Sequence, residues 1–156
     1  TLNTHSLAER NMNPSSPPLP DPLSKQTGYH SLQEVNQSRS APPAASGWLR
    51  ESGYVPCCAK DLNTVSPCAS RAVIRADNHA LNLALLLARA GVSYQWTWTP
   101  AKVGYGIYDE GLAVLSRSPI LGTSQFYITG IRDYELENPK ILGINTRTEY
   151  GNEYFT

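Results

Sequence analysis

The stretch "DNHALNLALLLARAG", residues 77–91, most constrains what this chain can fold into. Asp77 or Asn78 can accept the free N–H groups of a first helical turn, and Gly91 suits the left-handed residue that follows a helix. Apolar residues cover most of the surface of that helix, with few polar positions among them. Because such a helix must be largely buried, we predict that it packs against a sheet.

The residues after this helix alternate as those of a β-strand do. In "VSYQWTWT" (92–99), Tyr94, Trp96 and Trp98 fall on one face, and Gln95 and Thr97 on the other. We interpret the two tryptophans as core residues and not as a platform for stacking bases.

Further strands follow in the second half of the chain. They are predicted over "GLAVLSRS" (111–118), "SQFYITG" (124–130) and "PKILGINT" (139–146). A hairpin of 143–148 and 153–156 is predicted about a Gly151-Asn152 turn. The second half therefore indicates a mixed α/β domain whose last strands arrive consecutively.

The first half has a different composition. Nine of the twelve prolines precede residue 70, and "NPSSPPLPDPLSKQTG" (13–28) is typical of an extended, poorly ordered segment. We expect 11–28 and 38–70 to be irregular. Short strands are predicted at "TLNTHS" (1–6), with Leu2 inward, and at "HSLQEV" (30–35).

Charge and cysteine content exclude several classes. The chain has 13 basic residues (Lys and Arg) and 13 acidic residues (Asp and Glu), so its formal net charge is zero. It therefore has no overall positive field that would attract nucleic acid or anionic lipid. No apolar run reaches the roughly 18 residues of a membrane span. Cys57, Cys58 and Cys68 are predicted to be free thiols, because their number is odd and adjacent cysteines rarely bridge. These features favour a cytoplasmic protein, with secretion left open because we expect the native N-terminus to lie upstream of Thr1.

Four stretches, in order, carry a resemblance to a known family: "TLNTHS", "LQEVNQS", "YQWTWTPAKVGYGIYDEGLAVLSRSPI" and "PKILGI". They resemble the N-terminal half of bacterial members of the endonuclease/exonuclease/phosphatase superfamily, whose fold is that of deoxyribonuclease I. The resemblance is strong over 70–144, extends to 1–6 and 29–38, and is absent over 11–28, which we interpret as a divergent insertion or a sequence error. It implies a fold of the α/β (α+β) class, a four-layered αββα sandwich that is incomplete here. Residues 1–156 would form part of one such domain.

The resemblance also implies a metal site. The family's first strand ends in an Asn, and its second ends in a Gln-Glu whose Glu binds a divalent cation; these positions correspond to Asn3 and Glu34. The cofactor would be Mg²⁺, with Mn²⁺ as the alternative, and Mg²⁺ needs only one or two protein carboxylates. The competing interpretations are a solvated surface carboxylate for Glu34 and a strand-end residue bonded to the backbone for Asn3. His5 falls on the same side of the strand as Asn3, as a site-wall or a structural residue.

A second group of candidate residues lies in "GYGIYDEG" (104–111). By the resemblance this loop lies near the rim of the active site, where Tyr105, Tyr108 and Glu110 could contact substrate. The alternative is a rim loop of solvated acids and packing tyrosines. Functional residues favour such loops.

The family's general base and its partners come from a C-terminal half that is not recognisable here. We therefore predict a fragment of a divalent-metal-dependent phosphoester hydrolase that is inactive alone. Its substrate would be nucleic acid, a phospholipid head group or a small phosphorylated metabolite. The alternative is a non-catalytic remnant or binding module of the same fold. The sequence gives no indication of oligomeric state.

Overall fold

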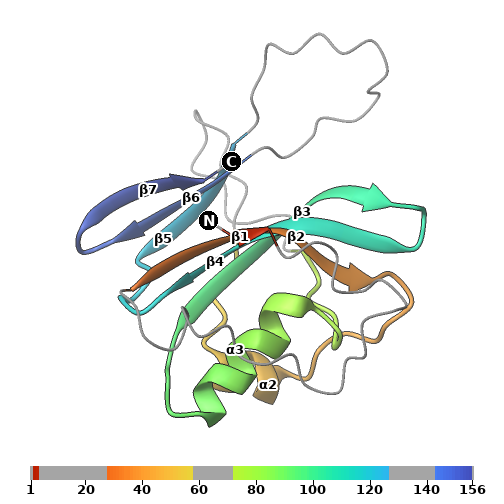
Figure 1. The fold of residues 1–156 in the computed structure, drawn as a ribbon, viewed down its shortest axis with the longest axis horizontal. Coiled ribbons are helices and arrows are strands. Elements are labelled where there is room, and N and C mark those ends of the chain that lie inside the picture. Colours follow the sequence, from red (N-terminus) through yellow and green to blue (C-terminus); the bar gives the residue numbers. More distant parts are fainter. Residues whose placement is uncertain (1, 4–27, 58–71, 127–142, 156) are drawn as a thin grey trace, which may run out of the picture.

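A computed structural model of the protein describes residues 2–3, 28–57, 72–126 and 143–155 (Figure 1). They form a four-stranded sheet, a three-stranded sheet and two helices, α2 (Ser46–Ser52) and α3 (His79–Arg89). In this part of the chain no helix is long and apolar enough to cross a membrane. The mixed architecture agrees with the predicted α+β class.

The four-stranded sheet has the order β1 (Leu2–Asn3), β2 (Tyr29–Ser38), β4 (Tyr108–Ser116), β3 (Gln95–Gly104). β1 runs parallel to β2, whereas β2 and β3 both run antiparallel to β4. β3 lies at an edge, which is where a strand tolerates the missing N–H of Pro100.

The three-stranded sheet has the order β5 (Gly122–Phe126), β6 (Gly143–Thr148), β7 (Gly151–Phe155), all antiparallel. The predicted C-terminal hairpin is confirmed, but its predicted turn is wrong. Thr148 pairs with Gly151, so Glu149 and Tyr150 form the turn and Gly151 already belongs to β7. The Gly-Asn dipeptide suggested a turn because glycine can adopt a positive φ. Gly151 does so, at φ 120°, but as the first residue of β7 and not within the turn.

The buried helix predicted from the sequence is confirmed as α3. The Asn78 side chain accepts hydrogen bonds from the N–H groups of Ala80 and Leu81, at 3.0 and 3.2 Å, and Gly91 is left-handed at φ 85°. The helix packs on the sheet through the core residues of one cluster, which includes Trp96 and Trp98, exposed by 0% and 1%. The interpretation of both tryptophans as core residues is therefore confirmed.

The other face of the four-stranded sheet packs against the three-stranded sheet. Leu112 and Val114 of β4 form a second buried cluster with Ile144 of β6, and the hydroxyls of Tyr29 and Thr146 lie 2.8 Å apart. The described residues thus build three layers, with helices outside one sheet and a second sheet on its inner face (Figure 1). The described residues do not include the second helical layer, which in the predicted four-layered sandwich would cover the three-stranded sheet.

The expectation that 38–70 is irregular is wrong for α2. This helix has no side-chain cap and is short, so its sequence signal is weak. It is stabilised by tertiary contacts instead, since the Trp96 indole N–H donates to the Ser52 hydroxyl at 2.9 Å. Gly53 ends it at φ 78°, where a Cβ would collide with the Tyr94 carbonyl oxygen.

Several other predictions fall on residues 4–27, 58–71 and 127–142, outside the described part of the chain. They include the irregular segment up to residue 27, the end of the 124–130 strand, and the thiols of Cys58 and Cys68. Cys57 is described, and its side chain is buried.

Candidate functional site

Strand β2 does not end at Glu34, as the resemblance implies, but continues through a bulge to Ser38. Leu32 pairs with Ala113 and Val35 with Gly111, so Gln33 and Glu34 together oppose a single residue of β4. Glu34 has φ 55°, in the left-handed region that glycine usually occupies at such bulges. A non-glycine residue held there carries backbone strain of about 1–3 kcal/mol, and such residues cluster at functional sites.

The described part of β1 ends beside this bulge. Asn3 pairs with Gln33, the residue that precedes Glu34. The backbone register therefore brings the two predicted metal ligands to adjacent strands at the same level of the sheet. The side chain of Asn3 and all of His5 lie outside what the structure describes.

A second bulge lies on the opposite flank of β4. Pro100 pairs with Gly111 and Lys102 with Glu110, which leaves Ala101 as an extra residue in β3. The Lys102 ammonium lies 3.1 Å from a carboxylate oxygen of Glu110. Bulges re-aim side chains, and here the two bulges bring Glu34 and Lys102 to either side of the strand that carries Glu110.

The charges of this cluster act on one another. The hydrogen bond from the ammonium to Glu110 is the first cause that raises the pKa of Lys102, and the negative charges of Glu110 and Glu34 add to it. The Lys102 side chain is 54% exposed and that of Glu110 16%. One cation thus lies in the field of two carboxylates at a position that solvent and ligands can reach.

The tyrosines lie at and beside the tip of the β3–β4 hairpin. Tyr105 and Gly106 have φ 47° and 72°, and the Ile107 N–H donates to the Gly104 carbonyl at 3.0 Å, as in a type I′ turn. Tyr105 is 88% exposed, and its ring meets that of Tyr108 edge-on with centroids 6.0 Å apart. The predicted rim loop is therefore wrong for Tyr108 and Glu110, which belong to β4; only the turn between the strands is irregular, because the hairpin is tight.

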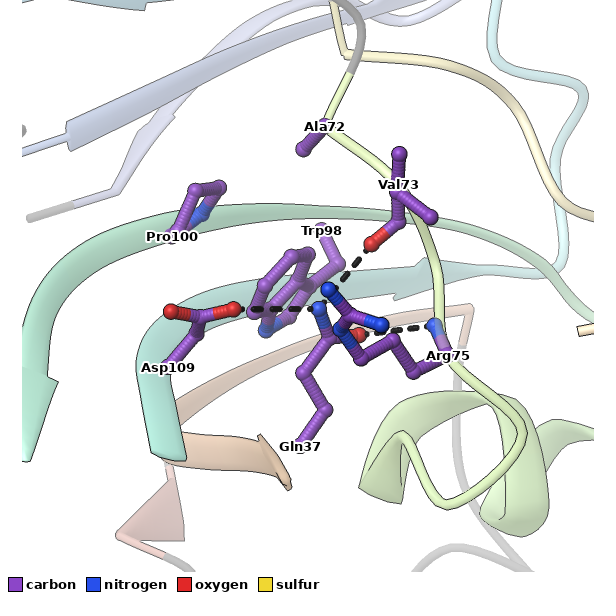
Figure 2. A pocket seen from close by; sticks show the side chains of 7 residues that line it. All are labelled: Gln37, Ala72, Val73, Arg75, Trp98, Pro100 and Asp109. Atoms are coloured by element: carbon purple, nitrogen blue, oxygen red, sulfur yellow. Dashed lines mark hydrogen bonds between the residues drawn. The ribbon is translucent and has the colours of Figure 1, made fainter. Parts of the chain in front are cut away.

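The acidic pair at the start of β4 is divided between the two faces of the sheet. Successive strand residues point to opposite sides, so Asp109 faces away from Glu110. Asp109 lines a cavity of about 220 Å³ whose other walls include Gln37, Arg75 and Trp98 (Figure 2).

The polar centre of this cavity is the Gln37 amide, which already has its partners. It donates to the Val73 carbonyl at 2.9 Å, and its oxygen accepts from the Arg75 backbone N–H at 2.9 Å (Figure 2). The same oxygen also accepts from the Asn78 amide at 3.0 Å. This network ties the 73–75 segment and the start of α3 to the sheet, which is a structural role.

The donor set beside Glu34 suits a hard cation. Glu34 and Glu110 offer oxygen ligands, and Mg²⁺ binds through one or two carboxylates while keeping several waters. The described residues hold no group of three or more His, Cys, Asp or Glu side chains of the kind that would enclose a metal. These carboxylates could hold Mg²⁺ or Mn²⁺ together with several waters, whereas a closed structural zinc site would need four protein ligands.

Sequence reasoning missed Lys102 and Asn36. Lys102 is a single lysine in an edge strand, and only the unforeseen bulge at Ala101 brings it opposite Glu110. Asn36 is 2% exposed and pairs with Glu110 from the β2 side, so it lies in the same row across the three strands. The sequence did not indicate that Asn36 lies beside Glu110, because the resemblance predicted that this strand ends at Glu34.

No protein-family model matches the sequence. No curated protein matches it either. Among solved structures, a similar chain is an endonuclease/exonuclease/phosphatase family protein from Leptotrichia buccalis C-1013-b, at 23% sequence identity and a TM-score of 0.49. The similarity covers 84% of this chain and 40% of that one, so this chain spans less than half the length of its structural neighbour. The neighbour carries the family name that the sequence resemblance indicates.

Proposed function

We propose that this chain is part of a divalent-metal-dependent phosphoester hydrolase, in which Glu34 and Asn3 bind Mg²⁺ or Mn²⁺. The observation that carries the proposal is the strained, left-handed conformation of Glu34 in a bulge beside the backbone of Asn3. Residues held in such a conformation cluster at functional sites.

A bound cation would polarise the phosphoryl oxygen and stabilise charge on the departing oxygen. The chain's own residues would bind and orient: Glu34 by its carboxylate, and Asn3 by its amide oxygen. The proposed substrate is nucleic acid, a phospholipid head group or a small phosphorylated metabolite.

We further propose that the 156 residues bind the cation without rapid turnover. Of the described histidines, His30 lies 3.2 Å from the Tyr94 hydroxyl and His79 is the first residue of α3. His30 therefore lies on the face of the sheet that the helices cover, and His79 lies in one of those helices. Neither is placed beside Glu34 as a general base. This observation also favours the second candidate, a binding module of the same fold that has lost its chemistry.

The direct test is Mn²⁺ binding, measured by electron paramagnetic resonance on the 156-residue chain and on Glu34→Gln. We expect the substitution to weaken binding at least tenfold, since a charged ligand becomes neutral. Glu51→Gln is the matched control, because Glu51 is an exposed carboxylate paired with Arg89 at 3.1 Å on the helical layer. Equal Mn²⁺ affinity in the parent chain and in Glu34→Gln would refute the metal site.

Hydrolysis separates the two candidates. Mg²⁺-dependent cleavage of a phosphodiester by the 156 residues, lost on Glu34→Ala, would contradict the proposed lack of turnover and exclude the binding module. Cation binding without cleavage would agree with both the fragment and the binding module, and the same assay on a longer chain from the same gene would then distinguish them.

A further inference from the structure

The bulge in β3 selects which residue stands opposite Glu110. In a regular ladder that continued from the Pro100–Gly111 pair, Ala101 would oppose Glu110; the extra residue places Lys102 there instead. The bulge therefore has the specific effect of placing an ammonium among the carboxylates.

A phosphoester anion meets an electrostatic problem at this cluster. Glu34 and Glu110 are both negative, and like charges a few ångströms apart repel. Lys102 pairs with Glu110 at 3.1 Å, and it is more than half exposed whereas Glu110 is mostly covered. An incoming anion can thus reach the ammonium while the Glu110 carboxylate stays behind it.

We propose that Lys102 binds a non-bridging oxygen of the substrate phosphoryl group, and that Glu110 positions the ammonium for this contact. The inference rests on the proposed function, and it changes the expected role of Glu110 from a substrate contact to a positioning residue. A lysine suits the role because its ammonium is a compact charge with three donors, of which one can bind Glu110 and another a phosphate oxygen.

The test is the affinity for inorganic phosphate without divalent cation, measured by ³¹P NMR titration of the 156-residue chain. We expect Lys102→Met to weaken phosphate binding at least about tenfold and Lys102→Arg to restore part of it. Arg89→Met is the matched control, because it breaks an exposed ion pair of the same 3.1 Å length on the helical layer, and it should leave phosphate affinity unchanged. Equal phosphate affinity in the parent chain and in Lys102→Met, or no phosphate binding by the parent chain, would overturn the proposal.

A double-mutant cycle tests the positioning role of Glu110. If Glu110 only repelled phosphate, Glu110→Gln would strengthen binding by the same factor with Lys102 present or replaced by methionine. If Glu110 positions the ammonium, Glu110→Gln should increase phosphate affinity by a smaller factor when Lys102 is present than when it is replaced by methionine. We expect the two factors to differ at least about threefold. Equal factors in the two backgrounds would remove the positioning role.

These outcomes are distinguishable from failure of the proposed function. Mn²⁺ binding that depends on Glu34, together with phosphate binding that ignores Lys102, would leave the metal site standing and overturn only this inference. Phosphate binding that depends on Lys102, without Glu34-dependent Mn²⁺ binding, would support an anion site here and refute the hydrolase.

Discussion

Replacing Glu34 by glycine should separate the stability of the fold from the function of the site. The left-handed φ of 55° disfavours any side chain with a Cβ, by roughly 1–2 kcal/mol, and glycine escapes that cost. Glu34→Ala removes the same carboxylate but keeps the Cβ. We therefore expect the free energy of unfolding of Glu34→Gly to be about 1 kcal/mol higher than that of Glu34→Ala. For a chain of this size, this corresponds to a melting temperature about 2–4 °C higher.

Chemical denaturation and thermal melting of the two variants, followed by circular dichroism, measure this difference. The neighbouring residue supplies a matched control. Gln33 lies in the same strand and its φ is not positive, so Gln33→Gly should be less stable than Gln33→Ala, by about 0.5–1 kcal/mol. If alanine were as stable as glycine at position 34, the reasoning from backbone strain would be refuted. Both Glu34 variants should lose Mn²⁺ binding, whichever of them is more stable.

Three further predictions concern the packing around the bulges and the start of α3. Gly111→Ala should destabilise the fold by about 1–3 kcal/mol in urea titrations, because the added Cβ would collide with the Thr99 carbonyl oxygen and lie 2.6 Å from the Trp98 indole nitrogen. Trp98→Phe should cost about 1–3 kcal/mol by the same measurement, because the Val35 carbonyl in the bulged strand loses its 3.0 Å hydrogen bond. Burial lowers the pKa of His79, so the unfolded chain binds a proton first as the pH falls below about 6.5; stability should therefore fall from pH 7 to pH 5, and by less in His79→Gln.

The helix and the core strands were predictable because their signals are local. Asn78 and Gly91 bracket α3 within one stretch of sequence, and alternation at Trp96 and Trp98 shows the buried face of β3 directly. Each of these residues does in the fold what its type favours in isolation. The short helix α2 escaped prediction because its stability comes from contacts with β3, which no local pattern reveals.

The geometry of the candidate site was predictable only in part. Glu34 was found by its match to a family motif, but its bulge was not, since β2 continues beyond it and Glu34 takes the conformation of a glycine. Lys102 was missed for the same physical reason. A bulge changes which residues face each other across two strands, and this register depends on the partner strand.

Gly111 explains how both bulges can lie at one level of the sheet. It is the common partner of Val35 in β2 and Pro100 in β3. The bulge in β2 lies between the pairs of Gly111 and Ala113, and the bulge in β3 lies between the pairs of Gly111 and Glu110. The missing side chain lets the Trp98 ring lie over the β4 backbone, from where its N–H reaches the Val35 carbonyl across to β2. The tryptophan thus links the two bulged strands over the central one. A change at Gly111 or Trp98 should therefore disturb the proposed cation site and the proposed anion site together, although neither residue carries a charge.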